Sequence, residues 1–316
     1  MAGRETLLRS RKEDPMPSTA SGRPIVVGID GSAEATEAAV WAAGEAVRRG
    51  VPLRLVAVWH VVPGSDSSMM LYSVSEFVDE SRDSAREHLD AAVASATAAF
   101  PAVQVTAELV QGPAARTLLD CGRGAALLVI GSSERTRLDR LVFGSVTTHV
   151  TAHAPCPVVV VRPPVGGTGG PVVDGPVVVG IDGSEAARLA AEFGYDYAEA
   201  HGVELVALNA IPPNAVLGVT PTQRRDYHTA VEQDTAALVS DCRRRHPAVS
   251  TVIDVVEDDA AAALANRAKG ASLLVVGSHG KGAFRGMLLG SVSTSLAHRA
   301  PVTTAIVRPR VAEDLI

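Results

Sequence analysis

The sequence predicts an α/β protein made of two tandem open parallel-sheet sandwiches, each with the strand order 3-2-1-4-5. The main observation is a repeat: the run Val-Gly-Ile-Asp-Gly-Ser occurs at residues 27–32 and again at 179–184. A second landmark, an apolar run ending in glycine with Gly-Ser thirteen residues later, also occurs twice, at 127–145 and 273–291. The copies of the two landmarks lie 152 and 146 residues apart. That spacing is the size of a whole domain and too long for a solenoid repeat.

Changes in composition along the chain indicate the domain boundaries. Residues 1–22 are polar and charged, which is typical of a disordered tail. Residues 164–175 are rich in proline and glycine and read as a linker. The repeat then places the two domains at 23–163 and 176–310, with a short tail at 311–316.

Within each domain, short β-branched runs alternate with alanine-rich helical stretches, the pattern of βα units on a parallel sheet. The strands expected in the first domain are residues 25–29, 53–60, 103–110, 127–130 and 158–161. Those expected in the second domain are residues 177–181, 204–210, 251–256, 273–276 and 303–307. Most of these runs are continuously apolar, so we expect helices on both faces of each sheet. One helix is expected to begin after Ser32 and another after Ser184, and longer ones are expected at 75–99 and 224–246.

Composition limits the class of function. The 316 residues are 47% hydrophobic and 20% charged, which is typical of a globular protein with an ample core. A net charge of −6 argues against nucleic-acid binding as the main purpose. No apolar run is long enough to cross a membrane or to act as a leader peptide, so we expect a cytoplasmic protein. Cys121, Cys156 and Cys242 have no metal or redox spacing and are expected to pack as small apolar residues.

Glycine clusters fall at the carboxyl ends of the first and fourth strands of each domain, where open α/β sheets bind ligands. The second domain reads Gly277-Ser-His-Gly280, then nine residues, then Gly290-Ser291. Glycines let backbone N–H groups approach an anion, and a helix beginning at Gly290-Ser291 would offer its N-terminus to a phosphate. The P-loop and dinucleotide-binding motifs are absent, so the pattern indicates a nucleotide pocket of another type. The alternative is that these glycines serve only tight turns between strands and helices.

A family resemblance follows from these motifs together. The spacing Gly-x-x-Gly-x9-Gly-Ser, the strand-one run and the ending Ala-Pro-x5-Val-Arg-Pro at 154–163 and 300–309 resemble the ATP-binding universal stress proteins. The resemblance covers about residues 24–309. It implies five-stranded sandwiches of the adenine-nucleotide α-hydrolase type that bind ATP, with bound Mg²⁺ left open and without a catalytic triad. It places Gly180 and Asp182 against adenosine and the backbone of Ala210 against adenine.

The candidate binding residues form one set in each domain. In the second domain they are Gly180, Asp182, Ala210, Val276, Gly277, Ser278, His279, Gly280, Lys281, Gly282, Gly290, Ser291 and Val292. In the first domain they are Gly28, Asp30, Gly131, Gly144 and Ser145. His279 and Lys281 have two readings, contact with phosphate or exposure to water.

The first domain departs from the family pattern because Glu134 stands where the second phosphate-binding glycine belongs. At about 4 Å and an effective dielectric constant near 20, its charge would repel a phosphate charge by roughly 4 kcal/mol. We therefore expect the first site to be weak or empty. Arg135 and Arg137, or an outward turn of Glu134, are the ways in which this repulsion could be offset.

The expected function is nucleotide-dependent sensing or regulation in a stress response, with an adenine nucleotide and an unidentified protein as partners. No catalytic residue is assigned. Two alternatives remain: a slow ATPase or nucleotidyl-transfer enzyme, and a nucleotide-free scaffold that binds a partner.

Three further expectations concern residues outside the glycine clusters. The final strands, 158–161 and 303–307, are expected to pair with each other and make an internal pseudo-dimer, and a homodimer is left open. His149, His153 and His298 are expected at the surface or in packing contacts, with metal binding as the alternative. The acidic residues 257–259 are expected to begin a helix, again with metal binding as the alternative.

Overall fold

The computed structural model of the chain describes residues 22–60, 73–132, 145–163, 174–282 and 288–309. The first half contains β1 (Ile25–Ile29), α1 (Ala33–Arg49), β2 (Leu53–Trp59), α2 (Ser73–Ala99), β3 (Val105–Gln111), α3 (Ala114–Gly122), β4 (Leu127–Gly131), α4 (Ser145–His153) and β5 (Val158–Val161). The second half contains β6 (Val177–Gly180), α5 (Glu185–His201), β7 (Leu205–Ile211), the 3₁₀ helix η1 (Pro213–Val216), α6 (Pro221–Arg245), β8 (Thr251–Glu257), α7 (Ala260–Arg267), β9 (Leu273–Gly277), α8 (Ser291–Arg299) and β10 (Thr304–Val307). Most of the predicted linker and tails lies outside the described residues.

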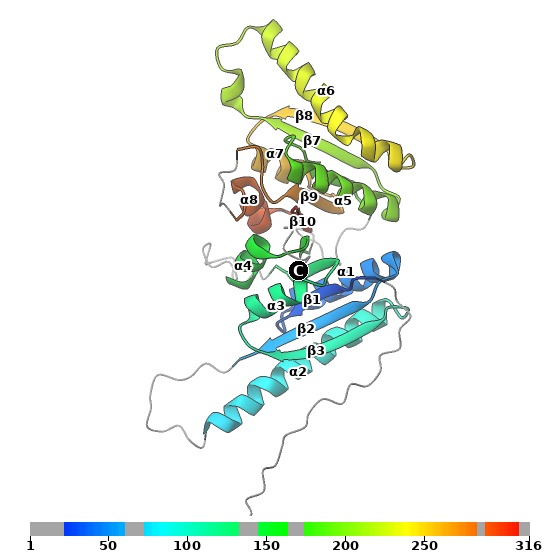
Figure 1. The fold of residues 1–316 in the computed structure, drawn as a ribbon, viewed down its shortest axis with the longest axis vertical. Helices are drawn as coiled ribbons and strands as arrows, with labels where there is room; N and C mark the ends of the chain where they lie inside the picture. The colour runs from blue at the N-terminus through cyan, green and yellow to red at the C-terminus, as the bar shows by residue number, and fades with distance from the viewer. Residues whose placement is uncertain (1–21, 61–72, 133–144, 164–173, 283–287, 310–316) are drawn as a thin grey trace, which may run out of the picture.

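The ten described strands form one sheet in the order β3-β2-β1-β4-β5-β10-β9-β6-β7-β8 (Figure 1). Within each half the neighbouring strands are parallel, and their order is the predicted 3-2-1-4-5. The halves meet where β5 and β10 pair antiparallel, with Val159 opposite Ala305. The predicted pairing of the two final strands is therefore confirmed, and it joins the two sandwiches into one continuous sheet.

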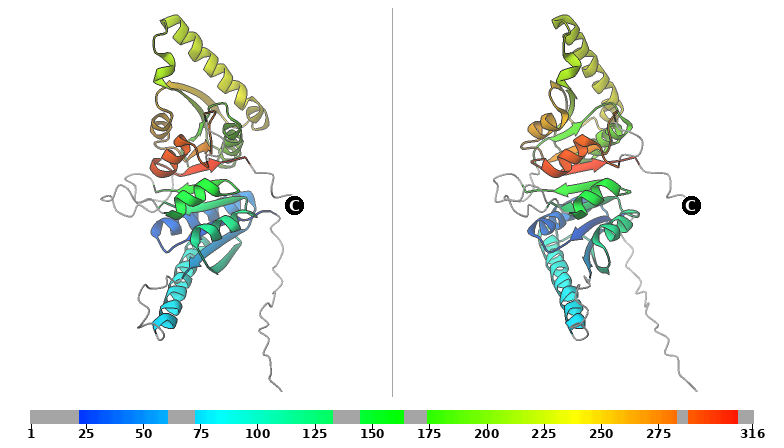
Figure 2. Two further views of the ribbon diagram at one scale, coloured as in Figure 1. Left: turned by 60° about the vertical axis from the view of Figure 1, so that its left-hand side comes forward. Right: turned by 90° about the vertical axis from the view of Figure 1, so that its left-hand side faces the viewer.

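Helices cover both faces of the sheet, as the apolar strands predicted (Figure 2). In β1, Ile25, Val27 and Ile29 pack in a core with α1, α2, α5 and α6, and this core continues across the β5–β10 junction into the second half. Val26, which points to the other face, packs in a separate core with α3 and α4. The corresponding core of the second half lies under α7 and α8. One face thus holds a single core shared by both halves.

The helices that follow β1 and β6 begin and end with the expected signals. The side chains of Ser32 and Ser184 each accept a 3.1 Å hydrogen bond from the backbone N–H three residues further on. Both helices end at a glycine in the left-handed conformation, Gly50 at φ 62° and Gly202 at φ 66°. These caps fix the point at which the chain leaves the carboxyl end of each first strand, and so they shape the adjacent loops.

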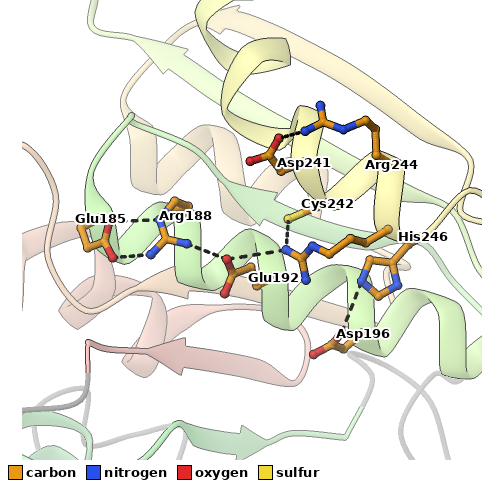
Figure 3. A network of polar contacts seen from close by, with 9 residues as sticks. Glu185, Arg188, Glu192, Asp196, Asp241, Cys242, Arg244 and His246 are labelled. Atoms are coloured by element: carbon orange, nitrogen blue, oxygen red, sulfur yellow. Dashed lines mark hydrogen bonds and ion pairs between the residues drawn. The ribbon is translucent and has the colours of Figure 1, made fainter.

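The long helices α2 and α6 project beyond the sheet at opposite ends of the molecule (Figures 1 and 2). Figure 3 shows how charged side chains join the C-terminal part of α6 to α5. Arg188 donates a 2.6 Å hydrogen bond to Glu192, and Arg245 lies 3.6 Å from the same carboxylate. The N-terminal part of α6 is exposed along its length. The C-terminal part of this helix is therefore packed against α5, whereas the N-terminal part is tied to β8 by side-chain contacts such as that of Arg224 with Glu257.

The cysteines lie in positions where small apolar residues pack. Cys156 and Cys242 are buried, Cys121 is half-buried, and none of the three is joined in a disulfide in the part of the chain that the structure describes. Within the part of the chain that the structure describes, no helix is both long and apolar enough to cross a bilayer.

Candidate functional site

A cavity of about 350 Å³ opens at the carboxyl ends of β6, β7 and β9, next to the point where strand order reverses. Its size suits a small-molecule ligand. All of the second-domain candidates except Ser278 line it. The lining residues that the sequence did not single out are Ile181, Ser184, Ala187, Leu208, Ala260, Leu264 and Ser293.

One end of the cavity is apolar. Leu208 and Ala210 come from β7, Leu264 from α7 and Val276 from β9. Gly180 keeps this end open at the side of β6, because a Cβ there would lie 3.1 Å from a methyl carbon of Leu264. This end of the cavity therefore presents apolar surface between the strand ends and α7.

The other end of the cavity is the N-terminus of α8. Gly290 is the N-cap residue, and since it has no side chain it leaves the first N–H groups of the helix without a side-chain cap. In the neighbouring helices α5 and α7, Ser184 and Asp259 provide such caps. Ser291, the first helical residue, adds an exposed hydroxyl. This end of the cavity therefore offers hydrogen-bond donors and a partial positive charge to an anion.

Two bonds hold α8 in this position. The Gly290 N–H donates a 2.8 Å hydrogen bond to the carbonyl oxygen of Ser278, and the Ser293 hydroxyl donates a 2.6 Å hydrogen bond to that of Gly277. The helix N-terminus is thus tied to the end of β9.

Asp182 joins the two loops that border the cavity. One is the turn after β6 that contains Gly183, and the other is the loop after β9 that contains Gly280, which we call the glycine loop. One of its carboxylate oxygens accepts a 3.0 Å hydrogen bond from the Ser184 N–H, and the other accepts a 2.9 Å bond from the Lys281 N–H. The Ser184 hydroxyl adds a second link, a 3.2 Å hydrogen bond donated to the carbonyl oxygen of His279. A Cβ at Gly280 would lie 2.4 Å from an Asp182 carboxylate oxygen, so a side chain there would displace this carboxylate. Asp182 therefore positions the glycine loop as well as lining the cavity.

The side chains of the glycine loop lie on different sides. The ammonium group of Lys281 folds over the turn at Gly183 (φ 80°) and brings a positive charge to the rim of the cavity. Ser278 points away from the cavity: it is fully buried, and its hydroxyl lies 2.9 Å from Nδ1 of His279. Ser278 therefore stabilises the loop through this hydrogen bond.

Gly277 has a packing role of its own. A Cβ at this position would lie 2.7 Å from the backbone carbonyl carbon of Ala186, so the glycine allows the first turn of α5 to cross the end of β9 closely. Gly131 makes the same approach to Glu34 in the first half, at 2.5 Å. Both glycines therefore allow a helix to pack closely on the end of a strand, and Gly277 also lines the cavity.

The structure describes only part of the corresponding loops in the first half. Gly28 ends β1 near Leu118, and a Cβ there would lie 2.8 Å from a Leu118 methyl carbon. The Asp30 carboxylate accepts hydrogen bonds from the N–H and the hydroxyl of Ser32, at 3.0 and 2.6 Å. Ser145 begins α4 and is exposed. Gly144 and Glu134 lie outside the described residues, so the expectation of a weak first site stays a prediction.

The acidic residues 257–259 act as a helix start. The Asp259 side chain caps α7 by accepting a 3.0 Å hydrogen bond from the Ala262 N–H. Among the described residues, no group of three or more histidines, cysteines and carboxylates could hold a metal ion. Asp259 thus begins the helix as expected, whereas Glu257 ends β8 and pairs with Arg224.

The fold and the site together define a tandem doubly wound α/β protein. Its second half has a cavity at the carboxyl ends of the strands, where the strand order reverses. A sequence profile described as the Universal stress protein family matches residues 22–162 and 175–308. A universal stress protein of Mycolicibacterium smegmatis is 34% identical over 304 residues, covering 93% of this chain and 100% of the relative. One from Mycobacterium tuberculosis is 35% identical over 289 residues, covering 90% and 96%.

A solved structure shares the fold. The crystal structure of a universal stress protein from Archaeoglobus fulgidus superposes with a TM-score of 0.65 at 16% identity, covering 92% of this chain and 97% of that one. The chain belongs to the universal stress protein family, with two tandem domains, so the resemblance to this family inferred from its motifs is confirmed at the level of the family.

Proposed function

We propose that the second domain binds ATP and that the protein acts in a stress response through its nucleotide state. The observation that carries the proposal is the composition of the cavity, which joins an apolar end at Leu208 and Leu264 to an anion-binding end at the N-terminus of α8. An adenine nucleotide has the same division between an apolar base and charged phosphates. A site for ATP also fits a cytoplasmic protein.

The proposed orientation puts adenine between β7 and α7 and the phosphates at the glycine loop. The N–H groups of Ser291 and Val292 and the Ser291 hydroxyl would then donate to phosphate oxygens. The Lys281 ammonium at the rim would supply the positive charge. Mg²⁺ bound to the phosphates is compatible with this orientation, since the phosphates reach the open side of the cavity.

Calorimetric titration of the full chain with ATP tests the proposal, and we expect about one tight site per chain. Ser291→Pro is the informative variant, because it removes the N–H and the hydroxyl of the first residue in α8. Gly290 already has the extended backbone that a residue before proline requires, at φ −71° and ψ 159°. Ser291→Ala is the matched control, since it removes the hydroxyl and keeps the N–H.

We expect Ser291→Pro to weaken ATP binding by at least tenfold, with a smaller effect for Ser291→Ala. That is a loss of about 1.4 kcal/mol of binding free energy or more. An unchanged affinity in both variants would exclude the end of α8 as the phosphate site. Two equal tight sites per chain would instead show that the first domain binds despite Glu134.

The other functions make different predictions. Turnover of bound ATP in a single-turnover assay would favour a slow ATPase or nucleotidyl-transfer enzyme. The two oxygens of Asp182 already accept backbone hydrogen bonds, so this carboxylate is poorly placed to act as a base. The absence of nucleotide in the purified native protein, with no thermal shift on adding ATP, would favour a scaffold. A homodimer stays a prediction, and it would need a surface other than the paired strands β5 and β10.

A further inference from the structure

Two histidines lie on the solvent side of α4, away from the cavity. His149 and His153 are one helical turn apart, and both are exposed. Their rings stack, with the centroids 4.2 Å apart and the planes inclined by 26°. Positions four residues apart share one face of a helix, so both imidazoles are available to the same ligand.

The hydrogen bond of His153 fixes how its ring can act. Nδ1 lies 2.9 Å from the carbonyl oxygen of His149. Because a carbonyl oxygen only accepts, Nδ1 carries the proton, and in the neutral ring the lone pair is at Nε2. A histidine that binds a metal commonly has this arrangement, with one ring nitrogen held by a carbonyl group and the other directed at the ion.

We propose that His149 and His153 form a binding site for a divalent transition-metal ion of the class that prefers imidazole, Zn²⁺ or Cu²⁺. Zn–N bonds of about 2.0–2.1 Å in tetrahedral geometry hold two ligand nitrogens roughly 3.3 Å apart. The two ring centroids are 4.2 Å apart, and the exposure of both side chains leaves them room to rotate toward a shared ion. Two histidines at this spacing on a helix are also the pair that binds zinc in helical metal motifs.

The surroundings of the pair favour a cation with two protein ligands. α4 ends at His153, where the last carbonyl groups of the helix carry a partial negative charge. Among the described residues, no third histidine, cysteine or carboxylate joins the pair, so the proposal rests on these two imidazoles. The positive charge of Arg308 approaches the same helix at the Thr151 carbonyl, but Thr151 is buried on the opposite side.

The site is confined to the first half of the chain. α8 corresponds to α4 in the repeat, and it carries Ser295 and Arg299 where α4 carries His149 and His153. Two histidines of the second half have carboxylate partners: His201 lies 2.6 Å from Glu45, and His246 lies 2.9 Å from Glu199. The metal site is therefore separate from the proposed nucleotide site and independent of it.

Calorimetric titration of the untagged, nucleotide-free full chain with ZnCl₂ tests the proposal. We expect one Zn²⁺ per chain, and we expect His149→Ala and His153→Ala each to weaken binding by roughly 100-fold, because each leaves a single imidazole without the effective concentration of the second. His60→Ala is the matched control, an exposed histidine outside the pair, and should leave the affinity unchanged. Both histidines of the pair are exposed, so the variants should keep the fold, which circular dichroism checks.

Electron paramagnetic resonance of the Cu²⁺-loaded chain gives a second measurement. Coupling to two imidazole nitrogens is expected in the wild type and coupling to at most one in either variant. The proposal is overturned if the wild type does not bind Zn²⁺, or if the single variants bind it as tightly as the wild type does.

Discussion

Arg308 donates a 2.7 Å hydrogen bond to the carbonyl oxygen of Thr151, a residue of the other half of the chain. Arg162 makes the corresponding bond to the carbonyl oxygen of Ala297, and the two arginines and the two acceptors are each 146 residues apart. Each half therefore extends an arginine from the end of its last strand to the helix that follows the glycine loop of the other half. These reciprocal contacts flank the β5–β10 pairing and give the junction approximate two-fold symmetry.

Replacing Arg308 with methionine should destabilise the chain by about 1.5–3 kcal/mol, the typical value of a hydrogen bond to a charged group. Burial lowers the pKa of Arg308 from its ordinary value, yet the guanidinium remains charged, so the bond is charge-assisted. Urea denaturation of the full chain measures the loss. Arg244→Met is the control, an exposed arginine whose only described partner is the exposed Asp241. A loss no larger than that of the control would mean that the junction does not depend on this contact.

On the face of the sheet that α1 and α5 cover, the two halves contribute different side chains to the junction. Nε2 of His201 donates a 2.6 Å hydrogen bond to the buried carboxylate of Glu45. The ring of Tyr197 stacks on His201 at 3.9 Å between centroids and on Trp41 at 6.5 Å. The repeat aligns Glu45 with Tyr197 and Arg49 with His201. The buried carboxylate of one half is thus matched to a histidine that only the other half provides.

Glu45→Gln should destabilise the chain at neutral pH by about 1.5–3 kcal/mol, the usual contribution of a hydrogen bond to a charged group. Burial alone would raise the pKa of Glu45, but the hydrogen bond from His201 and the charges of Arg49 and Arg48 hold it below its ordinary value of 4.5. A lowered pKa in the folded state means that the stabilisation is present above about pH 4.5 and is lost as the pH falls through the folded value. The difference between wild type and variant should therefore shrink below that pH.

Urea denaturation at a series of pH values measures this dependence. Glu232→Gln, at an exposed position on α6, should give a small difference at every pH. A difference for Glu45→Gln that stays constant from pH 7 down to the acid unfolding of the chain would contradict the assignment.

The strand order and most of the lining residues could be predicted because they depend on local signals. Apolar runs identify the strands, and glycines at their carboxyl ends identify the loops. The sequence did not reveal that Ser278 lies outside the cavity lining, because the glycine motif does not determine which way each side chain points. Its N–H pairs with the Val307 carbonyl oxygen at 2.6 Å, which continues the β9–β10 pairing and directs its side chain inward.

Residues that depend on distant partners could not be predicted. Leu208 and Leu264 have the same pattern as core residues, and only the packing of α7 beside β7 shows that they line a cavity. Glu45 interrupts an apolar helix face, but its partner His201 lies 156 residues away. Periodicity within one helix carries no information about such a partner.

Gly277→Ala should destabilise the second domain by about 1–3 kcal/mol through overpacking, because its Cβ would lie 2.7 Å from the backbone of Ala186. Backbone atoms of a helix yield less readily than a side chain, so the strain falls on the contact between α5 and β9. Thermal unfolding measures the effect. Gly124→Ala is the control, a turn glycine with open space where the Cβ would be. Equal stability of the two variants would mean that α5 moves away from β9 at little cost.

Gly280→Ala should weaken ATP binding, and Gly282→Ala should not. A Cβ at Gly280 would lie 2.4 Å from an Asp182 carboxylate oxygen and would displace the group that accepts the Lys281 N–H, whereas the same atom at Gly282 meets open space. The loss of one loop-positioning bond predicts about a tenfold decrease in affinity, or 1.4 kcal/mol.

Gly280→Glu should abolish the site, because it adds a charge beside the phosphates as Glu134 is expected to do in the first domain. Calorimetry with ATP measures all three variants, and thermal unfolding confirms that they remain folded. If Gly280→Ala and Gly282→Ala bind ATP equally well, the link from Asp182 does not position the glycine loop; if Gly280→Glu also binds normally, the phosphates are held elsewhere.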